Sequence, residues 1–127
     1  MRQITYIDLF AGAGGLSEGF FRAGFKPVAH VEMNSDACNT LKTRIAFHYL
    51  STNGNFSSYI SYLKGEIPRN KLWELVPDSL MKSVINQEIS ENTIADIFEK
   101  IDKSKNSERV DLIIGGPPCQ AYSVVGR

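Results

Sequence analysis

The sequence lacks any apolar run long enough to cross a lipid bilayer, and its 14 basic and 14 acidic residues leave no net charge. A neutral chain gives no argument for or against a nucleic-acid partner. It opens with MRQITYIDLF rather than with the charged and then apolar leader of a secreted protein. We therefore expect a cytoplasmic protein whose 127 residues, 43% of them hydrophobic, form one domain around its own core.

Cysteine and histidine are scarce, with two residues of each type. Cys38 and Cys119 lie far apart, so a disulfide framework is not expected and both thiols should be reduced. Cys38 shares a helical face with Leu41, which predicts a buried and unreactive side chain. His30 and His48 have no second ligand at metal spacing, so no metal site is predicted.

Apolar segments that alternate between strand and helix patterns predict an α/β fold. The pattern predicts strands at 4–10, 27–33 and 110–116, and helices at 16–23, 37–45 and 94–101. The segment from about 48 to 85 contains shorter amphipathic pieces, including 72–76 and 80–85, and is predicted to be a helical insertion. The alternation implies a parallel sheet whose strands are joined by crossover helices.

The unusual residues of the chain follow the predicted strands. A glycine-rich turn follows the first strand, Glu32 ends the second, Glu88 lies near a third, and Cys119 follows the last. Ligands of open parallel sheets bind beyond the carboxyl ends of the strands. The sequence therefore predicts that these residues meet at one edge of the sheet.

The turn DLFAGAGGLSEGF places Gly12, Gly14 and Gly15 between a strand and a helix. Glycines let the backbone turn tightly and come close to a ligand, although a turn of purely structural purpose has a similar composition. The G-x-G-x-x-G spacing of dinucleotide-binding proteins is missing, because Gly15 directly follows Gly14. Glu32 either accepts hydrogen bonds from a ribose diol or is a solvated strand end. Both features together favour a cofactor that contains a nucleoside.

The last stretch, DLIIGGPPCQAYSVVGR, places a thiol on a rigid loop. Pro117 and Pro118 fix their own φ angles and restrict the residue before each, so they hold Cys119 in one position. That rigidity suits a preorganised nucleophile, whose thiolate would need a nearby positive charge such as Arg127. A packed cysteine on a surface turn fits these residues equally well, and the loop alone does not separate the two interpretations.

The segments DLFAGAGGLSEGF, VEMN and GGPPCQAYSVVGR resemble, in this order, conserved blocks of the DNA (cytosine-5)-methyltransferase family. The PPCQ loop paired with the DLFAGAGG turn is highly specific, and the pair decides the interpretation of Cys119 in favour of the nucleophile. The resemblance implies the first part of a Rossmann-like parallel sheet of the S-adenosylmethionine-dependent methyltransferase type. It also implies a set of cofactor-binding residues, namely Phe10, Ala11, Gly12, Gly14, Gly15, Leu16, Glu32, Met33, Glu88, Ile89 and Pro118.

The resemblance gives some of these residues separate roles. Glu32 would hold the ribose hydroxyls, Met33 would contact the adenine, and Pro118 would lie between the cofactor and the target base. The family has an Asp-Ile pair for the adenine amino group, where this sequence has Glu88 and Ile89 in NQEIS. The departure from aspartate to glutamate leaves that contact an open question for the structure.

The implied reaction is methylation of C5 of cytosine in double-stranded DNA, as in restriction–modification systems. Cys119 would add to C6 of the cytosine, which makes C5 nucleophilic enough to accept the methyl group. Loss of the C5 proton would then release the thiolate. The cytosine must leave the helix stack to be reached, so the resemblance also implies base flipping.

Later conserved blocks of the family are absent from the sequence, including the Glu-Asn-Val block and the target-recognition region. We therefore expect residues 1–127 to be an N-terminal part of a catalytic domain, inactive without a complementary C-terminal part. The open sheet edge should promote self-association. Two alternatives remain: a nicotinamide-linked oxidoreductase, although the dinucleotide glycine pattern is missing, and a non-catalytic cofactor-binding or split-enzyme partner subunit.

Overall fold

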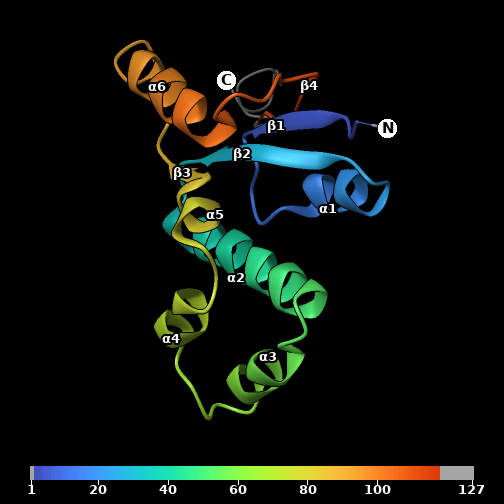
Figure 1. Cartoon of the computed structure of the whole chain (residues 1–127). Helices are drawn as coiled ribbons and strands as arrows, with labels where there is room; N and C mark the ends of the chain where they lie inside the picture. The colour runs from blue at the N-terminus through green and yellow to red at the C-terminus, as the bar shows by residue number, and fades with distance from the viewer. Residues whose placement is uncertain (1, 118–127) are drawn as a thin grey trace.

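A computed structural model describes residues 2–117, which fold around a parallel sheet with helices on both faces (Figure 1). The strands run in the spatial order β3-β2-β1-β4. All neighbouring pairs are parallel. Their bounds are Thr5–Leu9 for β1, Lys26–Glu32 for β2, Val84–Asn86 for β3 and Leu112–Gly115 for β4.

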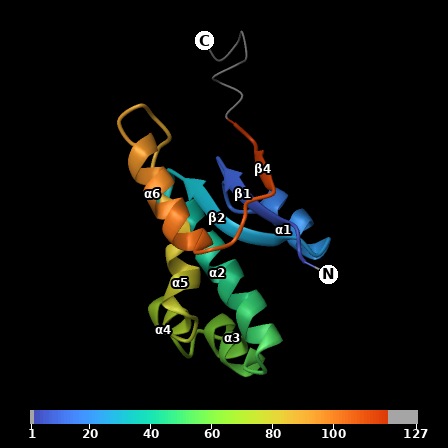
Figure 2. The same cartoon turned by 45° about the horizontal axis from the view of Figure 1, so that its top comes forward.

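The central strand β1 is hydrogen-bonded on both sides, and this explains its apolar and β-branched sequence TYIDL. Ile7 pairs with Ala29 of β2 and with Ile113 of β4. Parallel pairing brings the carboxyl ends of the strands to one edge of the sheet, as Figure 2 shows for β1, β2 and β4. The segments that follow these strands therefore lie close together in space.

Two layers of helices cover the sheet. The helix α6 (Ile94–Lys105) packs Ile97 and Ile101 on the face that carries Ile7 and Val31. Side chains of consecutive strand residues point to opposite faces, so Tyr6 lies on the other face. There the Tyr6 hydroxyl contacts Ser17 of α1 (Gly15–Arg22) at 2.7 Å between the two oxygens.

Local sequence signals set the ends of the first two helices. Gly24 has φ +92° just after α1, the left-handed conformation with which glycine commonly ends a helix. Asn34 caps α2 (Ser35–Thr52), and its side-chain oxygen accepts a hydrogen bond of 2.8 Å from the Ala37 amide. Cys38 is buried on this helix together with Leu41, as the helical face predicted.

Three short helices follow α2, namely α3 (Phe56–Leu63), α4 (Arg69–Glu74) and α5 (Asp78–Lys82). Together with the distal half of α2 they enclose a separate apolar cluster around Leu50, Leu72 and Val76. Figures 1 and 2 place α3 and α4 at the end of the molecule away from the sheet. We call this part, residues 46–82, the helical lobe.

The structure differs from the sequence prediction at two boundaries. The helix α2 continues to Thr52, past the predicted start of the insertion. Val84 and Ile85 belong to β3 and not to an amphipathic helical piece at 80–85. Three residues are too few to reveal a strand pattern, and pairing of β3 with His30–Glu32 of β2 decides their conformation.

The four-stranded parallel sheet and its helices confirm the predicted fold class, the opening part of a Rossmann-like methyltransferase sheet. Among residues 2–117, no helix combines the length and the apolar character that a bilayer span requires.

Candidate functional site

A cavity of about 420 Å³ lies where the strands end, and four segments of the chain contribute to it. Six residues predicted to bind a cofactor line it: Phe10, Gly12, Glu32, Met33, Glu88 and Ile89. Four further residues complete the lining: Val31, Gln87, Gly116 and Pro117. The volume lies in the range of small-molecule sites in proteins. The sheet edge therefore carries a ligand-sized hollow at the predicted position.

The turn after β1 shapes the floor of this cavity. Phe10 has φ +55° and Gly12 has φ +60°, so the chain enters the left-handed region twice within three residues. A bulky residue such as Phe10 adopts this conformation only where its surroundings impose it, and such strain is concentrated at functional sites. The Ala11 amide donates a hydrogen bond of 3.0 Å to the Val31 carbonyl, which ties the turn to β2.

Gly12 leaves open space on the cavity side of the turn. A Cβ atom built on Gly12 would meet no other atom within 4 Å, and the same holds for Gly116 after β4. At Gly12 the positive φ explains the choice of glycine, and the open space lets a ligand approach the backbone.

Glu32 joins the turn to the start of α2. Its Oε1 accepts a hydrogen bond of 2.9 Å from the Gly12 amide, and its Oε2 accepts one of 2.8 Å from the Asn34 amide. Each carboxylate oxygen keeps a further lone pair, since an ionised carboxylate has about four acceptor positions. The side chain is thus fixed in position and still able to accept hydrogen bonds from a diol.

The walls of the cavity are apolar on two sides. Phe10 is 37% exposed and Met33 is 64% exposed, so both present large apolar surfaces to the cavity. Ile89 packs partly against the sheet core while it lines the cavity. A flat apolar group such as an adenine ring fits between such walls, next to an acceptor for its ribose.

Gln87, which the sequence reasoning missed, is held by α6. Its Nε2 donates a hydrogen bond of 2.9 Å to Asp96, and its Oε1 accepts one of 2.8 Å from Lys100. Val31 was also missed, because its strand position indicated core. Their positions in the sequence could have identified both residues as part of the site, because Val31 directly precedes Glu32 and Gln87 directly precedes Glu88.

The remaining predicted site residues lie elsewhere. Ala11 is buried against Cys38 and Leu41, and Leu16 is 48% exposed on α1. Gly14 and Gly15 line a second cavity between α1 and α2. The last two predicted residues, Pro118 and Cys119, lie outside the described residues. The structure therefore brings six of the predicted site residues together beyond the ends of the first three strands, and Pro117 lines the same cavity.

Two titratable residues are buried beneath the turn on the α1 face of the sheet. Asp8 is 1% exposed, and within the described chain neither carboxylate oxygen has a hydrogen-bond partner. Burial, with a smaller effect of the Glu32 charge, raises the pKa of Asp8 to about 6. His30, its neighbour on β2, bonds Ser17 through Nε2 at 2.7 Å, and burial lowers the pKa of His30 to about 4.

Comparison with known proteins extends this description. The family model of C-5 cytosine-specific DNA methylases matches residues 4–59 and 73–127. The unmatched residues between these segments, 60–72, fall in the helical lobe, from the second half of α3 to Leu72 of α4. The matched segments contain all four strands of the sheet and every residue that lines the cavity.

Curated relatives match almost the whole chain. A type II methyltransferase of Bacillus paralicheniformis is 40% identical over 141 residues, an alignment that covers 95% of this chain and 32% of the relative. A type II methyltransferase of Haemophilus parahaemolyticus is 31% identical, with 98% of this chain and 23% of the relative covered. DNA (cytosine-5)-methyltransferase 3 of Arabidopsis thaliana is 30% identical, with 99% and 9% covered. The chain thus spans a third or less of these relatives, and no solved structure matches it.

Proposed function

The chain belongs to the C-5 cytosine-specific DNA methylase family, and on that premise we propose that it forms the S-adenosylmethionine-binding and nucleophile-bearing part of a DNA (cytosine-5)-methyltransferase. One observation carries the proposal. Pro117 lines the same cavity as Glu32 and Phe10, and Pro117 directly precedes Pro118 and Cys119 in the sequence. The loop that bears the predicted nucleophile therefore starts at the wall of the predicted cofactor pocket.

The residues of the cavity fit the adenosine part of S-adenosylmethionine. Glu32 accepts hydrogen bonds from the ribose hydroxyls while it holds Gly12 and Asn34. Phe10 and Met33 flank the adenine ring, and the open backbone at Gly12 allows close approach. Glu88 and Ile89 take the place of the family's Asp-Ile pair beside the adenine. Bound S-adenosylmethionine supplies a methyl group on a sulfonium, an electrophile that needs no further activation.

Cys119 and Pro118 complete the proposed chemistry. The thiolate of Cys119 adds to C6 of a flipped cytosine, and the electron pair moves through the ring to make C5 nucleophilic. After C5 has gained the methyl group, a base removes the C5 proton and the Cys119–C6 bond breaks. Thiolate and 5-methylcytosine are then released. Two prolines before the thiol restrict its position and reduce the entropy lost when it is aligned with the base.

The partners follow from the family and the length of the chain. We propose double-stranded DNA as substrate and a complementary C-terminal part as the source of target recognition and of the remaining catalytic groups. Residues 1–127 then form the N-terminal part of one catalytic domain, and the short helices α3 to α5 of the helical lobe are an insertion between α2 and β3. Within the described residues, β4 is an edge strand, and Ile113 on it is 64% exposed. Such an edge suits a further strand or self-association.

Calorimetric titration tests the cofactor pocket with this chain alone. S-adenosylhomocysteine should bind, NAD should not, and Glu32→Gln should weaken binding by about 10- to 100-fold because a charged acceptor is lost. Glu91→Gln is the matched control, since Glu91 is an exposed glutamate outside the cavity. Equal affinity of the Glu32→Gln and Glu91→Gln variants would show that the nucleoside binds elsewhere.

A trapping experiment tests the nucleophile. The chain, supplied with a C-terminal part from a close relative, is incubated with S-adenosylmethionine and a duplex that contains 5-fluorocytosine. Fluorine at C5 blocks the final proton loss, so a covalent complex should accumulate. Cys119→Ser should abolish it, and Cys38→Ser should retain it, since Cys38 is buried in the core. Absence of an adduct with the wild-type chain under these conditions favours the non-catalytic partner subunit.

A further inference from the structure

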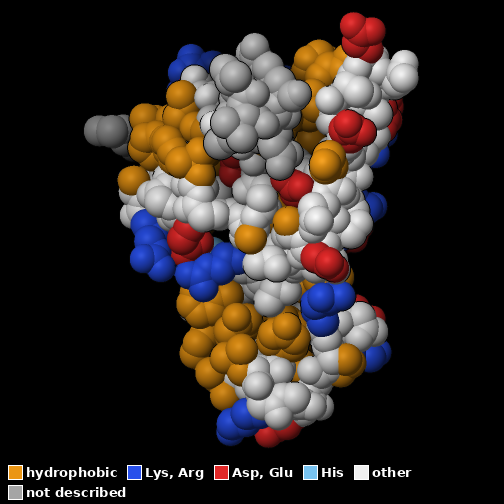
Figure 3. Space-filling view, turned by 180° about the vertical axis from the view of Figure 1, so that it is seen from behind, with side chains coloured by type: hydrophobic (Ala, Val, Ile, Leu, Met, Phe, Trp, Pro, Cys, Tyr) orange, Lys and Arg blue, Asp and Glu red, His pale blue; other side chains and the backbone are white. Residues whose placement is uncertain are grey.

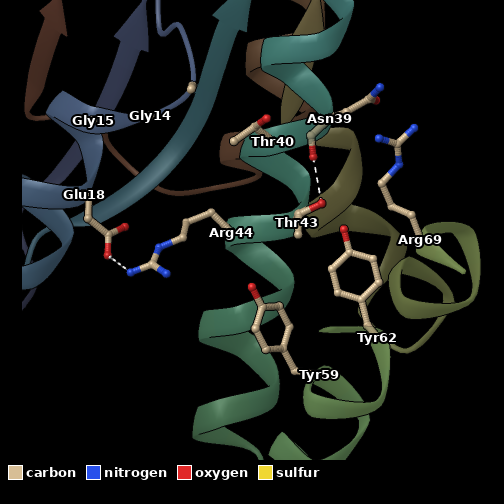
Figure 4. A pocket seen from close by; sticks show the side chains of 11 residues that line it. Gly14, Gly15, Glu18, Asn39, Thr40, Thr43, Arg44, Tyr59, Tyr62 and Arg69 are labelled. Carbon is tan, nitrogen blue, oxygen red and sulfur yellow. Dashed lines mark hydrogen bonds and ion pairs between the residues drawn. The ribbon is translucent and has the colours of Figure 1, made fainter. Parts of the chain in front are cut away.

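A second cavity, of about 490 Å³, lies between the glycine turn, α2 and the helical lobe. Gly14 and Gly15 form one side of it, α2 forms its base, and residues of α3 and α4 close the far side (Figure 4). Gly12 lines the cofactor cavity, so a single turn separates the two hollows. Tyr62 and Arg69 of the far wall belong to the part of the chain that the family model leaves unmatched, and nothing in the proposed methyl transfer uses them.

The acidic charge in this cavity is already balanced. Glu18 of α1 accepts a hydrogen bond of 2.5 Å from Arg44 through Oε1, and its Oε2 lies 3.0 Å from Nε2 of His48. The Arg44 guanidinium and then the His48 contact hold the pKa of Glu18 down to about 2, against the opposing effect of its burial. The ionised Glu18 carboxylate is therefore paired with two residues of α2. It does not neutralise the cationic residue of α4.

That cationic residue is Arg69, which has no ion pair among residues 2–117. Its guanidinium lies over the ring of Trp73, 5.0 Å from the centroid, and Lys42 of α2 lies 5.2 Å from the same centroid. The Trp73 Nε1 in turn donates to the Thr43 hydroxyl at 3.4 Å. The cationic groups of Lys42 and Arg69 therefore both lie beside the Trp73 ring.

Neutral hydrogen-bond donors face the same space. Figure 4 shows Tyr59 and Tyr62 extending from α3 toward α2, and Arg69 on the side of Asn39. Within the described chain, the hydroxyls of Tyr59 and Tyr62 take part in no hydrogen bond to other residues. Figure 3 shows, on the face seen from behind, Lys and Arg side chains between the sheet and an apolar surface of the lower part.

We propose that this cavity binds a phosphate group of the DNA backbone, with Arg69 as its main ligand and Tyr59 and Tyr62 as hydroxyl donors. A guanidinium matches phosphate oxygens in bidentate fashion, and backbone contacts of this kind position a duplex without reading its sequence. The identity of the phosphate rests on the proposed function, because a DNA methyltransferase must bind a duplex. A free phosphate is the other source of the same chemistry.

Trp73 provides the test, since it is the only tryptophan of the chain. Its fluorescence is followed while a short duplex is added at several salt concentrations. The wild-type chain should bind non-specifically at low salt with a change in Trp73 emission. Arg69→Gln should weaken binding several-fold and reduce the slope of log K against log salt by about 1. Lys64→Gln, which removes a charge from the lobe outside the cavity, should change the Trp73 response far less.

Three further measurements distinguish the ways in which the proposed phosphate site could be wrong. Tyr62→Phe removes only a hydroxyl and should weaken duplex binding without changing the melting temperature, so it tests the site even if Arg69→Gln disturbs the lobe. Inorganic phosphate replaces the duplex in a parallel titration, and a Trp73 response to phosphate alone overturns the assignment to DNA. Identical duplex binding by wild type, Arg69→Gln and Tyr62→Phe overturns the site itself. Titration with S-adenosylhomocysteine should be unaffected by either variant, so loss of cofactor binding in the wild-type chain counts against the proposed function alone.

Discussion

Replacing Asp8 by Asn should stabilise the folded chain at neutral pH. Asp8 is 1% exposed in the central strand, and its carboxylate has no hydrogen-bond partner among residues 2–117. Burial first, and the charge of Glu32 second, raise the pKa of Asp8 from 3.8 to about 6. By linkage, the ionised carboxylate costs about 3 kcal/mol of unfolding free energy above pH 6, and none of this cost remains below about pH 4.

His30 acts in the opposite direction on the neighbouring strand, where it pairs in register with Asp8. Burial lowers the pKa of His30 from 6.5 to about 4, so the folded chain keeps the imidazole neutral. As the pH falls from 6.5 to 4, the unfolded chain binds a proton at His30 and the folded chain does not. The free energy of unfolding therefore decreases by about 3 kcal/mol over this range. The two effects oppose each other in one pH window, and the wild-type stability should change little there on their account.

Urea unfolding followed by Trp73 fluorescence between pH 4 and pH 8 measures the effect. The Asp8→Asn variant should gain up to about 3 kcal/mol over wild type near pH 7.5, and the gain should shrink towards zero at pH 4. An amide and a protonated carboxyl differ in stability by an amount that does not depend on pH, so the pH dependence of the difference is the decisive quantity. Asp102→Asn, on the exposed side of α6, is the control and should show no such dependence. A difference between Asp8→Asn and wild type that stays constant from pH 4 to pH 8 would refute the reasoning.

Other predictions concern the turn, the ion pairs and the pocket. Gly14→Ala should destabilise the chain by about 1–3 kcal/mol in urea unfolding, because Gly14 has φ +96° and a Cβ there would lie 2.7 Å from a side-chain carbon of α2. Gly19→Ala is the matched control inside α1, where a Cβ would meet no other atom within 4 Å, and it should stabilise the chain by about 0.5–1 kcal/mol. Glu18→Gln should lower stability by roughly 1 kcal/mol at pH 7, and because Arg44 holds the pKa of Glu18 at about 2, the loss should disappear as the pH falls from 4.5 towards 2 in the same assay. Met33→Ala should weaken S-adenosylhomocysteine binding several-fold in calorimetry without lowering the melting temperature, because Met33 is 64% exposed, and an equal drop in both would place Met33 in the core.

The sheet and the cavity at its edge follow from local patterns in the sequence. The β-branched segments at β1 and β2 and the glycine turn between β1 and α1 are signals within a few residues of one another, and parallel strands bring their ends together. Glu32, Phe10 and Glu88 meet in one cavity for this reason. The resemblance of the PPCQ loop to a known family added the prediction that Cys119 is the nucleophile, and Cys119 lies outside the described residues.

The sequence pattern failed where a contact between distant segments decides the outcome. Val84–Asn86 is too short to display a strand period, and it becomes β3 because β2 offers a free edge for pairing. The family resemblance implied a cofactor-binding role for Gly14 and Gly15, which stays a prediction, and only the structure showed that both also line the second cavity. The direction in which a turn residue faces depends on what packs against it.

The sequence by itself therefore determined the type and order of the elements near the site, because period, capping and turn chemistry act over short distances along the chain. Only the tertiary structure decided which side chains share a space. The burial of the Asp8 carboxylate and the cluster of Arg69 and Trp73 beside the glycine turn arise from the packing of segments far apart in sequence. Burial and charge at these positions are properties of the assembled fold, and no local pattern encodes them.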